Sequence, residues 1–317
     1  MPHLLIAGKL HPAGLALLEG VEDVTYDCVE EVSESSYAPL ISKADAVVIR
    51  TQPMSSATID RASRLKIVSR HGVGYDAVDM VALNKRRIPL CVVGDVNSLS
   101  VAEHAMALIL ASAKRLLRAD RSVRSGPWGW RNALEAGEIS GKNLLIIGYG
   151  RSGRHLARMA HGFEMQIRAF DPFLVKQGWP EGPTTPVQSL FEGLAWADVI
   201  SVHAPKSGRP ILGAEEFAQM KPGVIIVNTA RGGIVDEAAL ALALTEARVG
   251  TAGLDVFDDE PPAQDHPLLA FDQVVLSPHI AGLTQKAAER MAVSSVQNVL
   301  DFFAGRLDPH LVVNGVF

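Results

Sequence analysis

The chain has 317 residues, more than one hydrophobic core usually organises, so its length favours two domains. Apolar residues make up 48% of it and charged residues 21%, which is typical of globular enzymes and unlike disordered chains. The formal net charge of -5 offers no basic surface for nucleic acid or for a membrane, so we expect neither partner.

The N-terminus and the cysteines indicate a cytoplasmic protein. The opening MPHLLIAGKLHPAG has no basic region and only a short apolar run, which predicts a first strand rather than a signal peptide. No stretch approaches the roughly 18 apolar residues of a membrane span. Cys28 and Cys91 form no metal-binding motif and suit a reducing compartment, so we expect no metal.

Short apolar runs alternate with helical stretches along the chain. The early runs are LLIAG, VTYD, AVVIR, KIVSR and PLCVV, and the later ones are NLLIIG, QIRAFD, VISVH, VIIVNTA, GTAGLDV and QVVLSPH. Near-continuous apolar strands separated by helices predict parallel sheets covered on both faces. Because the pattern occurs twice, we predict an α/β protein of two Rossmann-like, doubly wound domains with a cleft between them.

A long helix is predicted between the two sets of strands. Ser100 and Glu103 have the spacing of a capping box, and an apolar stripe then continues from Val101 to about Arg124. A helix of that length could bridge two domains. The tryptophans that follow it, Trp128 and Trp130, either anchor a partner subunit or pack on their own domain.

The last stretch, QKAAERMAVSSVQNVLDFFAGR, is again helical, and sequence alone leaves its placement open. If it returns to the first domain, the chain crosses between the domains twice.

A glycine loop opens the second domain. Gly148, Gly150 and Gly153 have G-x-G-x-x-G spacing, after the strand NLLII and before a helical stretch. Such glycines allow a tight turn, the approach of a pyrophosphate and close packing of helix on strand. The next strand ends at Asp171, 23 residues after Gly148, where a carboxylate can bind ribose hydroxyls and repel a 2′-phosphate. This unit favours NAD over NADP, the alternative being a structural turn with Asp171 as a cap.

Polar residues stand at the predicted carboxyl ends of the later strands, where doubly wound sheets bind ligands. They are His203, Thr229, Ala230, Arg231, Asp255 and His279, with Glu260 in a short loop before two prolines. Each alone is most simply a packed or solvated loop residue. Together, beside a dinucleotide loop, they favour hydride transfer to a 2-keto acid. Histidine can donate the proton, a carboxylate can orient it, and arginine can hold the substrate carboxylate.

Several long motifs, in order, resemble the D-isomer-specific 2-hydroxyacid dehydrogenases. They are HGVGYDAVD, NSLSVAEHAMALIL, GYGRSGR with Asp171, NTARGGIVDEAAL, GLDVFDDEPP and SPHIAG, and together they cover nearly the whole chain. The resemblance implies catalytic roles for Arg231, Glu260 and His279, in which Glu260 supports His279 as the proton shuttle. It also implies that residues 1–98 and 285–317 form a substrate domain and that residues 99–284 form an NAD-binding Rossmann domain. The same resemblance implies a homodimer paired through the cofactor domain.

The resemblance extends to the binding residues. For the cofactor it implies Gly148, Tyr149, Gly150, Arg151, Ser152, Gly153, Asp171, His203, Ala204, Pro205, Thr229, Ala230 and Asp255, the last holding the nicotinamide carboxamide. For the substrate it implies Arg50, Val73, Gly74 and Asn97. The loop KSGRP after Pro205 is about two residues shorter than in relatives, which puts its cofactor contacts in doubt.

The substrate is less determined than the reaction. Arg50, Arg70 and His71 could form a basic wall, which favours a second anionic group and a 3-phosphoglycerate-like substrate. Alternatively Arg70 and His71 face away or pair with acidic neighbours. Glyoxylate or hydroxypyruvate reduction is the runner-up, and a non-catalytic NAD(H)-sensing protein is the third hypothesis, which intact catalytic residues disfavour.

Overall fold

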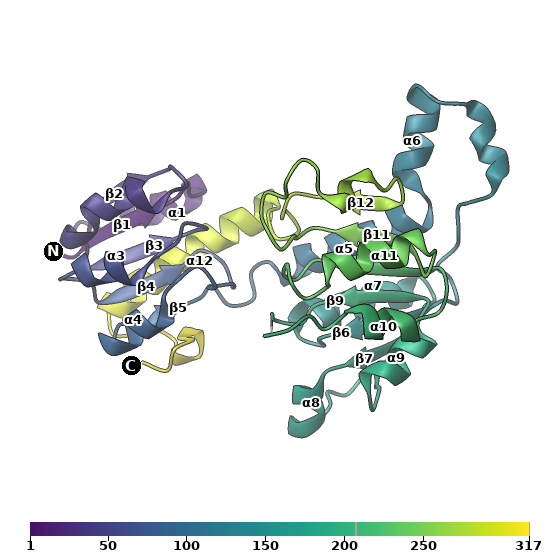
Figure 1. The fold of residues 1–317 in the computed structure, drawn as a ribbon. Coiled ribbons are helices and arrows are strands. Elements are labelled where there is room, and N and C mark those ends of the chain that lie inside the picture. The colour runs from purple at the N-terminus through teal and green to yellow at the C-terminus, as the bar shows by residue number, and fades with distance from the viewer. Residues whose placement is uncertain (207, 317) are drawn as a thin grey trace. The chain divides into compact units, whose positions relative to one another are not determined.

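The computed structural model describes residues 1–206 and 208–316, and the chain divides into two compact units. Unit 1 contains residues 1–97 together with the chain from 283 onward, and unit 2 contains residues 98–282 (Figure 1). Both units are α/β, with a parallel sheet in each, as the apolar runs predict.

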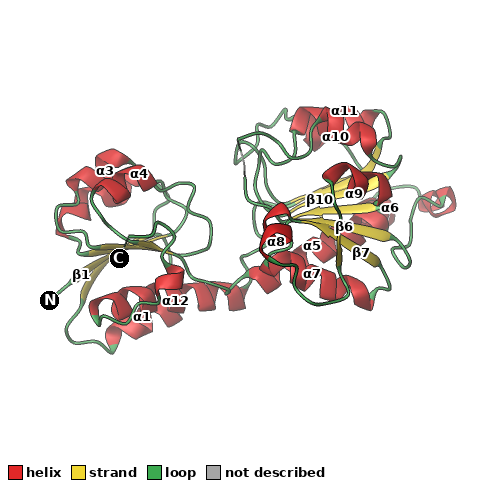
Figure 2. Ribbon diagram, turned by 90° about the horizontal axis from the view of Figure 1, so that it is seen from below, coloured by secondary structure: helices red, strands yellow, loops and turns green. Residues whose placement is uncertain are grey.

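Unit 1 is built around a sheet with the strand order β2-β1-β3-β4-β5, in which neighbouring strands run parallel. The strands are β1 (His3–Ala7), β2 (Thr25–Val29), β3 (Ala46–Ile49), β4 (Ile67–Arg70) and β5 (Leu90–Cys91). The helices are α1 (Pro12–Glu19), α2 (Glu34–Tyr37), η1 (Ala38–Lys43), α3 (Ser56–Arg61), α4 (Met80–Lys85), α12 (Gln285–Phe303) and η4 (Pro309–Leu311). Helices cover both faces of this sheet (Figure 2).

The closing helix α12 belongs to unit 1. Its buried side, which includes Val296 and Val299, packs in one apolar cluster with Leu4 and Ile6 of β1. Hydrogen bonds add to this packing, because Ser69 Oγ of β4 donates to the Ser295 carbonyl at 2.8 Å. The two ends of the chain therefore form one core, and the placement that sequence left open is settled by apolar contact with the first strands.

Unit 2 has a larger parallel sheet, in the order β12-β11-β10-β9-β6-β7-β8. Its strands are β6 (Asn143–Ile147), β7 (Gln166–Phe170), β8 (Thr185–Pro186), β9 (Val199–Val202), β10 (Val224–Asn228), β11 (Val249–Leu254) and β12 (Val274–Leu276). Its helices are α5 (Ser98–Ala113), α6 (Leu116–Arg124), η2 (Trp128–Ala133), α7 (Arg151–Gly162), α8 (Pro172–Gln177), α9 (Leu190–Trp196), α10 (Ala214–Gln219), α11 (Glu237–Thr245) and η3 (Pro267–Ala270). The two-residue strand β8 has no apolar run and was not expected.

The order of this sheet reverses beside β6. The chain runs outward from β6 through β7 and β8, then returns to β9 on the other side of β6. At such a switch point the loops leaving two adjacent strands diverge, and ligands bind at the carboxyl edge between them. The loop after β6 carries the three glycines, and the loop after β9 begins at His203.

The prediction of a single helix from Val101 to about Arg124 is wrong in its starting residue and in its continuity. Helix α5 begins at Ser98, and it ends at Ala113, after which Arg115 has a left-handed backbone (φ 51°). Gly137 N donates to the Ala113 carbonyl at 2.7 Å, and the Arg115 guanidinium donates to the Gly250 carbonyl at 3.2 Å. These tertiary contacts redirect the chain, and α6 extends as an arm from the body of unit 2 (Figure 1).

Among the described residues, no helix is long and apolar enough to cross a membrane.

Candidate active site

The glycine loop lies tightly against its surroundings at two positions and is open at the third. A Cβ on Gly148 would come within 2.6 Å of Ala204 N, and one on Gly153 would overlap the Gly148 carbonyl. A Cβ on Gly150 would meet nothing within 4 Å. The first and third glycines therefore allow the tight turn and the close packing of the loop on its neighbours. The second glycine leaves the backbone open to a ligand. That is the arrangement a diphosphate requires at the start of α7.

Two buried polar atoms lack partners beside this loop, at the ends of β9 and β10. His203 Nδ1 and Thr229 Oγ1 make no hydrogen bond among the described residues. His203 Nε2 lies 2.9 Å from Ser201 Oγ, and burial lowers the pKa of His203 to about 4, so its imidazole is neutral at pH 7. Unpaired buried donors and acceptors are costly, and a bound polar ligand is one way to satisfy them. The edge of the sheet thus fits a dinucleotide.

Asp171 links the glycine loop to the end of β7. Its Oδ2 accepts a hydrogen bond from Tyr149 N at 2.9 Å, and its Oδ1 accepts from Phe173 N and Leu174 N, both at 3.1 Å. Tyr149 is buried and stacks on Trp179, with ring centroids 5.1 Å apart. The half-buried carboxylate keeps lone pairs for ribose hydroxyls. It also opposes a 2′-phosphate through like charge, as the sequence predicts.

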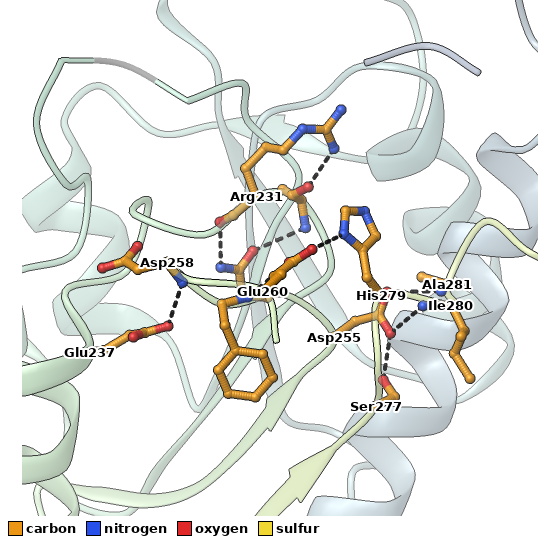
Figure 3. A network of polar contacts seen from close by, with 12 residues as sticks. Arg231, Glu237, Asp255, Asp258, Glu260, Ser277, His279, Ile280 and Ala281 are labelled. Carbon is orange, nitrogen blue, oxygen red and sulfur yellow. Dashed lines mark hydrogen bonds and ion pairs between the residues drawn. The ribbon is translucent and has the colours of Figure 1, made fainter. Parts of the chain in front are cut away.

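His279 and Glu260 form a hydrogen-bonded pair at the carboxyl edge of unit 2 (Figure 3). His279 Nδ1 lies 2.6 Å from Glu260 Oε2, and the other oxygen, Oε1, accepts from Phe257 N at 3.1 Å. The side chains are 49% and 37% exposed, so both stay accessible to a ligand. His279 has a left-handed backbone, with φ 52°. Such a conformation is uncommon for a residue with a Cβ and is often found at functional sites.

Arg231 stands at the start of the turn after β10. Asn228 organises this turn, because its side chain donates to the Arg231 carbonyl at 2.9 Å and accepts from Ala230 N at 3.0 Å. Arg231 Nη1 donates to the Ala230 carbonyl at 2.6 Å. A Cβ on Gly232 would overlap the Phe257 carbonyl, so the turn packs directly on the segment that leads to Glu260. The structure thus brings the loops of Arg231, Glu260 and His279 together (Figure 3).

Asp255 lies beneath His279. Its Oδ1 accepts from Ser277 Oγ at 2.6 Å and Ile280 N at 2.9 Å, and its Oδ2 accepts from Ala281 N at 2.8 Å. The side chain is fully covered, with 0% of its surface exposed. A role in holding the nicotinamide carboxamide, implied by resemblance, stays a prediction that requires this carboxylate to become uncovered.

Sequence reasoning did not single out Ser277 and His104, which contact Asp255. Ser277 directly precedes the Pro-His pair of the motif SPHIAG, and His104 lies inside the motif NSLSVAEHAMALIL. No spacing rule connects them, because they lie 173 positions apart and meet only through the packing of α5 on β11 and β12.

The predicted substrate residues lie in unit 1. Arg50 follows β3 and donates through Nη1 to the Lys9 carbonyl at 2.9 Å, at the point where the order of this sheet reverses between β1 and β3. Val73 is 41% exposed, and Gly74 and Asn97 are half-buried.

The predicted basic wall of Arg50, Arg70 and His71 lacks a charge on His71. His71 is only 6% exposed, and burial, with Arg50 and Arg70 nearby, lowers its pKa to about 3. It is therefore a neutral imidazole at pH 7 rather than a cation. Arg70 turns its Nη1 toward the carbonyls of Ile49 and His71.

The shortened loop after Pro205 is described in part. Ser207 lies outside the described residues. Lys206 and Gly208 are exposed, and Lys206 Nζ would be 2.7 Å from a Cβ on Gly233, in the turn after Arg231.

Comparison with known proteins agrees with this geometry. Residues 106–281 match the family model described as D-isomer specific 2-hydroxyacid dehydrogenase, NAD binding domain. The chain is 40% identical over 268 residues to D-3-phosphoglycerate dehydrogenase of Archaeoglobus fulgidus, covering 84% of this chain and 50% of the relative. It is 34% identical over 322 residues to glyoxylate reductase of Korarchaeum cryptofilum, covering 98% of this chain and 96% of the relative.

Solved structures share the fold over the full chain. A Thermus thermophilus protein has a TM-score of 0.88 and 31% identity, and the match covers 98% of this chain and 99% of that one. A D-lactate dehydrogenase of Aquifex aeolicus, solved with NAD and lactic acid, has a TM-score of 0.86 and 28% identity, and the match covers 98% of this chain and 99% of that one.

The chain belongs to the D-isomer specific 2-hydroxyacid dehydrogenase family and contains the NAD-binding domain of that family. It spans 50% of the length of the Archaeoglobus phosphoglycerate dehydrogenase and 59% of a Mycobacterium tuberculosis one.

Proposed function

We propose that the protein is an NAD-dependent oxidoreductase that transfers a hydride between NAD(H) and a D-2-hydroxyacid or its 2-keto acid. The observation that carries the proposal is the 2.6 Å contact between His279 Nδ1 and Glu260 Oε2, in the same unit as the glycine loop. Bound NAD would supply the hydride, held by the glycine loop, Asp171 and the ends of β9 and β10.

His279 moves the proton in this proposal. Because Nδ1 faces Glu260, the ring presents Nε2 as the nitrogen that can reach a substrate oxygen. In reduction Nε2–H donates to the ketone oxygen, and in oxidation Nε2 accepts the hydroxyl proton. Glu260 fixes the tautomer and orientation of the ring and is itself held by Phe257 N.

Arg231 holds the substrate. Its guanidinium can bind a carboxylate through two parallel N–H groups and polarise the neighbouring keto oxygen. The hydrogen bonds of Asn228 fix the backbone from which this side chain extends. Unit 2 in this assignment is the cofactor domain, and unit 1 is the substrate domain, with Arg50, Val73, Gly74 and Asn97 facing substrate.

A 3-phosphoglycerate-like substrate is the first candidate. Arg50 and Arg70 at the carboxyl edge of unit 1 can balance a second anionic group, although neutral His71 adds no charge. The D-3-phosphoglycerate dehydrogenase of Archaeoglobus fulgidus, 40% identical, supports this choice. Glyoxylate or hydroxypyruvate is the second candidate, because the glyoxylate reductase relative matches over 96% of its own length.

A homodimer in the cytoplasm completes the proposal. The arm of α6 and η2 exposes apolar side chains, including Leu116, Val123 and Trp128, which are 56%, 67% and 67% exposed. Exposed large apolar side chains commonly mark protein interfaces, and we expect a second copy of unit 2 to cover these. Trp130 instead binds within the arm, its Nε1 donating to Glu135.

The test is NADH oxidation, followed by absorbance, with a panel of 2-keto acids. The panel contains phosphohydroxypyruvate, sulfopyruvate, hydroxypyruvate, glyoxylate, pyruvate and a branched 2-keto acid. Fastest turnover of a phosphate- or sulfonate-bearing acid supports the first candidate, and fastest turnover of glyoxylate or hydroxypyruvate supports the second. Tight NADH binding without turnover of any acid would contradict the enzyme proposal and favour an NAD(H)-sensing protein.

A further inference from the structure

A chain of three side chains, His104, Ser277 and Asp255, lies beside the His279 loop, and neither His104 nor Ser277 has a role in the proposed reaction. His104 Nε2 lies 2.8 Å from Ser277 Oγ, and Ser277 Oγ donates to Asp255 Oδ1 at 2.6 Å. His104 Nε2 is also 3.5 Å from Asp255 Oδ1. Since Ser277 has one hydroxyl proton and gives it to Asp255, its oxygen accepts from His104 Nε2–H.

Asp255 holds the loop on both sides of His279 (Figure 3). Its backbone carbonyl accepts from His279 N at 2.8 Å, and its carboxylate accepts from Ser277 Oγ, Ile280 N and Ala281 N. His279 keeps a left-handed backbone, which an L residue rarely adopts without outside support. The contacts of Asp255 supply that support, because they fix Ser277 on one side of His279 and Ile280 and Ala281 on the other.

Helix α5 carries His104 into reach through a close approach to β11. A Cβ on Gly253 would come within 2.8 Å of Leu108 Cβ, one turn along α5 from His104, so only glycine allows this spacing. His104 keeps 23% of its side-chain surface exposed, while Asp255 is covered completely. A fully covered carboxylate needs hydrogen-bond donors around it. Ser277 completes the set of donors that the loop amides begin, and His104 in turn donates to Ser277.

We propose that His104 and Ser277 are positioning residues for His279. They hold the Asp255 carboxylate, and Asp255 holds the loop in the backbone conformation that points the imidazole at Glu260. The inference rests on the proposed function for its kinetic consequences, whereas its structural consequence can be measured without any substrate. Positioned groups act within narrow tolerances, and a shift of about 1 Å can lower a rate roughly 100-fold.

The variants are Ser277→Ala, His104→Ala and His104→Gln, with Ser295→Ala as the matched control. Ser295 is a fully buried serine of α12 in unit 1, whose hydroxyl donates to the Ala292 carbonyl at 3.1 Å, whereas the His279 loop belongs to unit 2. We expect Ser277→Ala to lower kcat roughly 10- to 100-fold with a smaller change in the KM of NADH. His104→Ala should act in the same direction, and His104→Gln, which keeps a donor, should recover part of the loss.

A second readout separates positioning from stability and from the proposed reaction. The downfield proton resonance of His279 Nδ1–H, identified by its loss in His279→Ala, reports the bond to Glu260. This resonance should shift or broaden in Ser277→Ala and stay unchanged in Ser295→Ala, when both variants are compared with wild-type protein of the same Tm. An unchanged resonance, or a kcat loss that merely follows a lowered Tm, would overturn the inference. If wild-type protein turns over no acid, the proposed function fails, and the resonance still decides the positioning role.

Discussion

Glu260 Oε2 accepts a short hydrogen bond from His279 Nδ1, at 2.6 Å, across two loops that leave neighbouring strands β11 and β12. Both loops end at the same edge of a parallel sheet, so the pairing follows from the topology. The contact leaves Nε2 as the imidazole nitrogen that can exchange a proton with a substrate.

Replacing His279 by alanine should remove proton transfer and leave NADH binding in place. General acid–base groups contribute typically 100- to 10,000-fold, so kcat should fall by about that factor. NADH affinity, measured by fluorescence titration, should change less than about threefold. His310→Ala, at an exposed histidine of unit 1, is the control and should behave as wild type. Equal losses of kcat and NADH affinity would indicate that His279 is structural.

Replacing Arg231 by lysine should be nearly as harmful as replacing it by alanine. Lysine keeps the charge but cannot grip a carboxylate with two parallel N–H groups, so transition-state binding is lost. We expect kcat/KM for the best keto acid to fall roughly 100-fold in both variants, about 2.7 kcal/mol. Steady-state kinetics check this, with Arg158→Lys on the exposed face of α7 as control. Full activity in Arg231→Lys would show that charge alone suffices.

Replacing Asp171 by alanine should weaken discrimination between NADH and NADPH. The variant loses the carboxylate that repels a 2′-phosphate and the acceptor for Tyr149 N. The ratio of kcat/KM for the two cofactors should move toward one. Some stability will also be lost, because Asp171 caps α8, and a lost cap costs about 0.5–2 kcal/mol. Ser189→Ala, which removes the α9 cap alone, should lower Tm without changing cofactor preference.

Acid should destabilise the protein through two histidines whose pKa values are lowered by burial of the imidazole, His71 and His203. The pKa of His71 is lowered to about 3 and that of His203 to about 4, whereas an unfolded imidazole titrates near 6.5. Between these values the unfolded chain binds more protons, so the free energy of unfolding decreases as pH falls below about 6.5. Each histidine contributes a slope of up to about 1.4 kcal/mol per pH unit.

Thermal melts from neutral to acid pH check this for wild type and for His71→Gln. The variant should lose Tm less steeply with falling pH, because glutamine has no proton to gain. His310→Gln, at an exposed position, should keep the wild-type slope. Parallel curves for wild type and His71→Gln would contradict the burial of a neutral imidazole at position 71.

Replacing Trp128 and Leu134 by serine should shift the protein from dimer to monomer. These side chains are 67% and 87% exposed, so they stabilise little within one chain, and their removal should leave Tm of the monomer nearly unchanged. Size-exclusion chromatography with light scattering measures the change. A monomeric wild type would contradict the dimer proposal directly.

The sequence alone predicted the strands other than β8, the glycine loop and the polar residues at the strand ends. Apolar runs such as LLIAG and NLLII mark buried parallel strands because both faces of these strands are covered. The glycine loop can be predicted from sequence because few backbone conformations allow a tight turn that a phosphate can approach. This restriction favours glycine at positions 148, 150 and 153. The proximity of the loops that carry Arg231, Glu260 and His279 can be predicted because all three loops follow parallel strands, whose carboxyl ends lie at one edge of the sheet.

Only the tertiary structure decided what depends on contacts between distant segments. The helix breaks near Arg115 because the Ala113 carbonyl accepts a hydrogen bond from Gly137 and the Arg115 side chain donates to Gly250. The apolar periodicity of the helix carries no information about these distant partners. His71 is a neutral imidazole because of burial, although its neighbours in sequence suggest a cation. Asp255 is enclosed by Ser277, which meets His104 from 173 residues away. Local patterns encode secondary structure and residue chemistry, whereas burial and hydrogen-bond partners arise only when the elements pack.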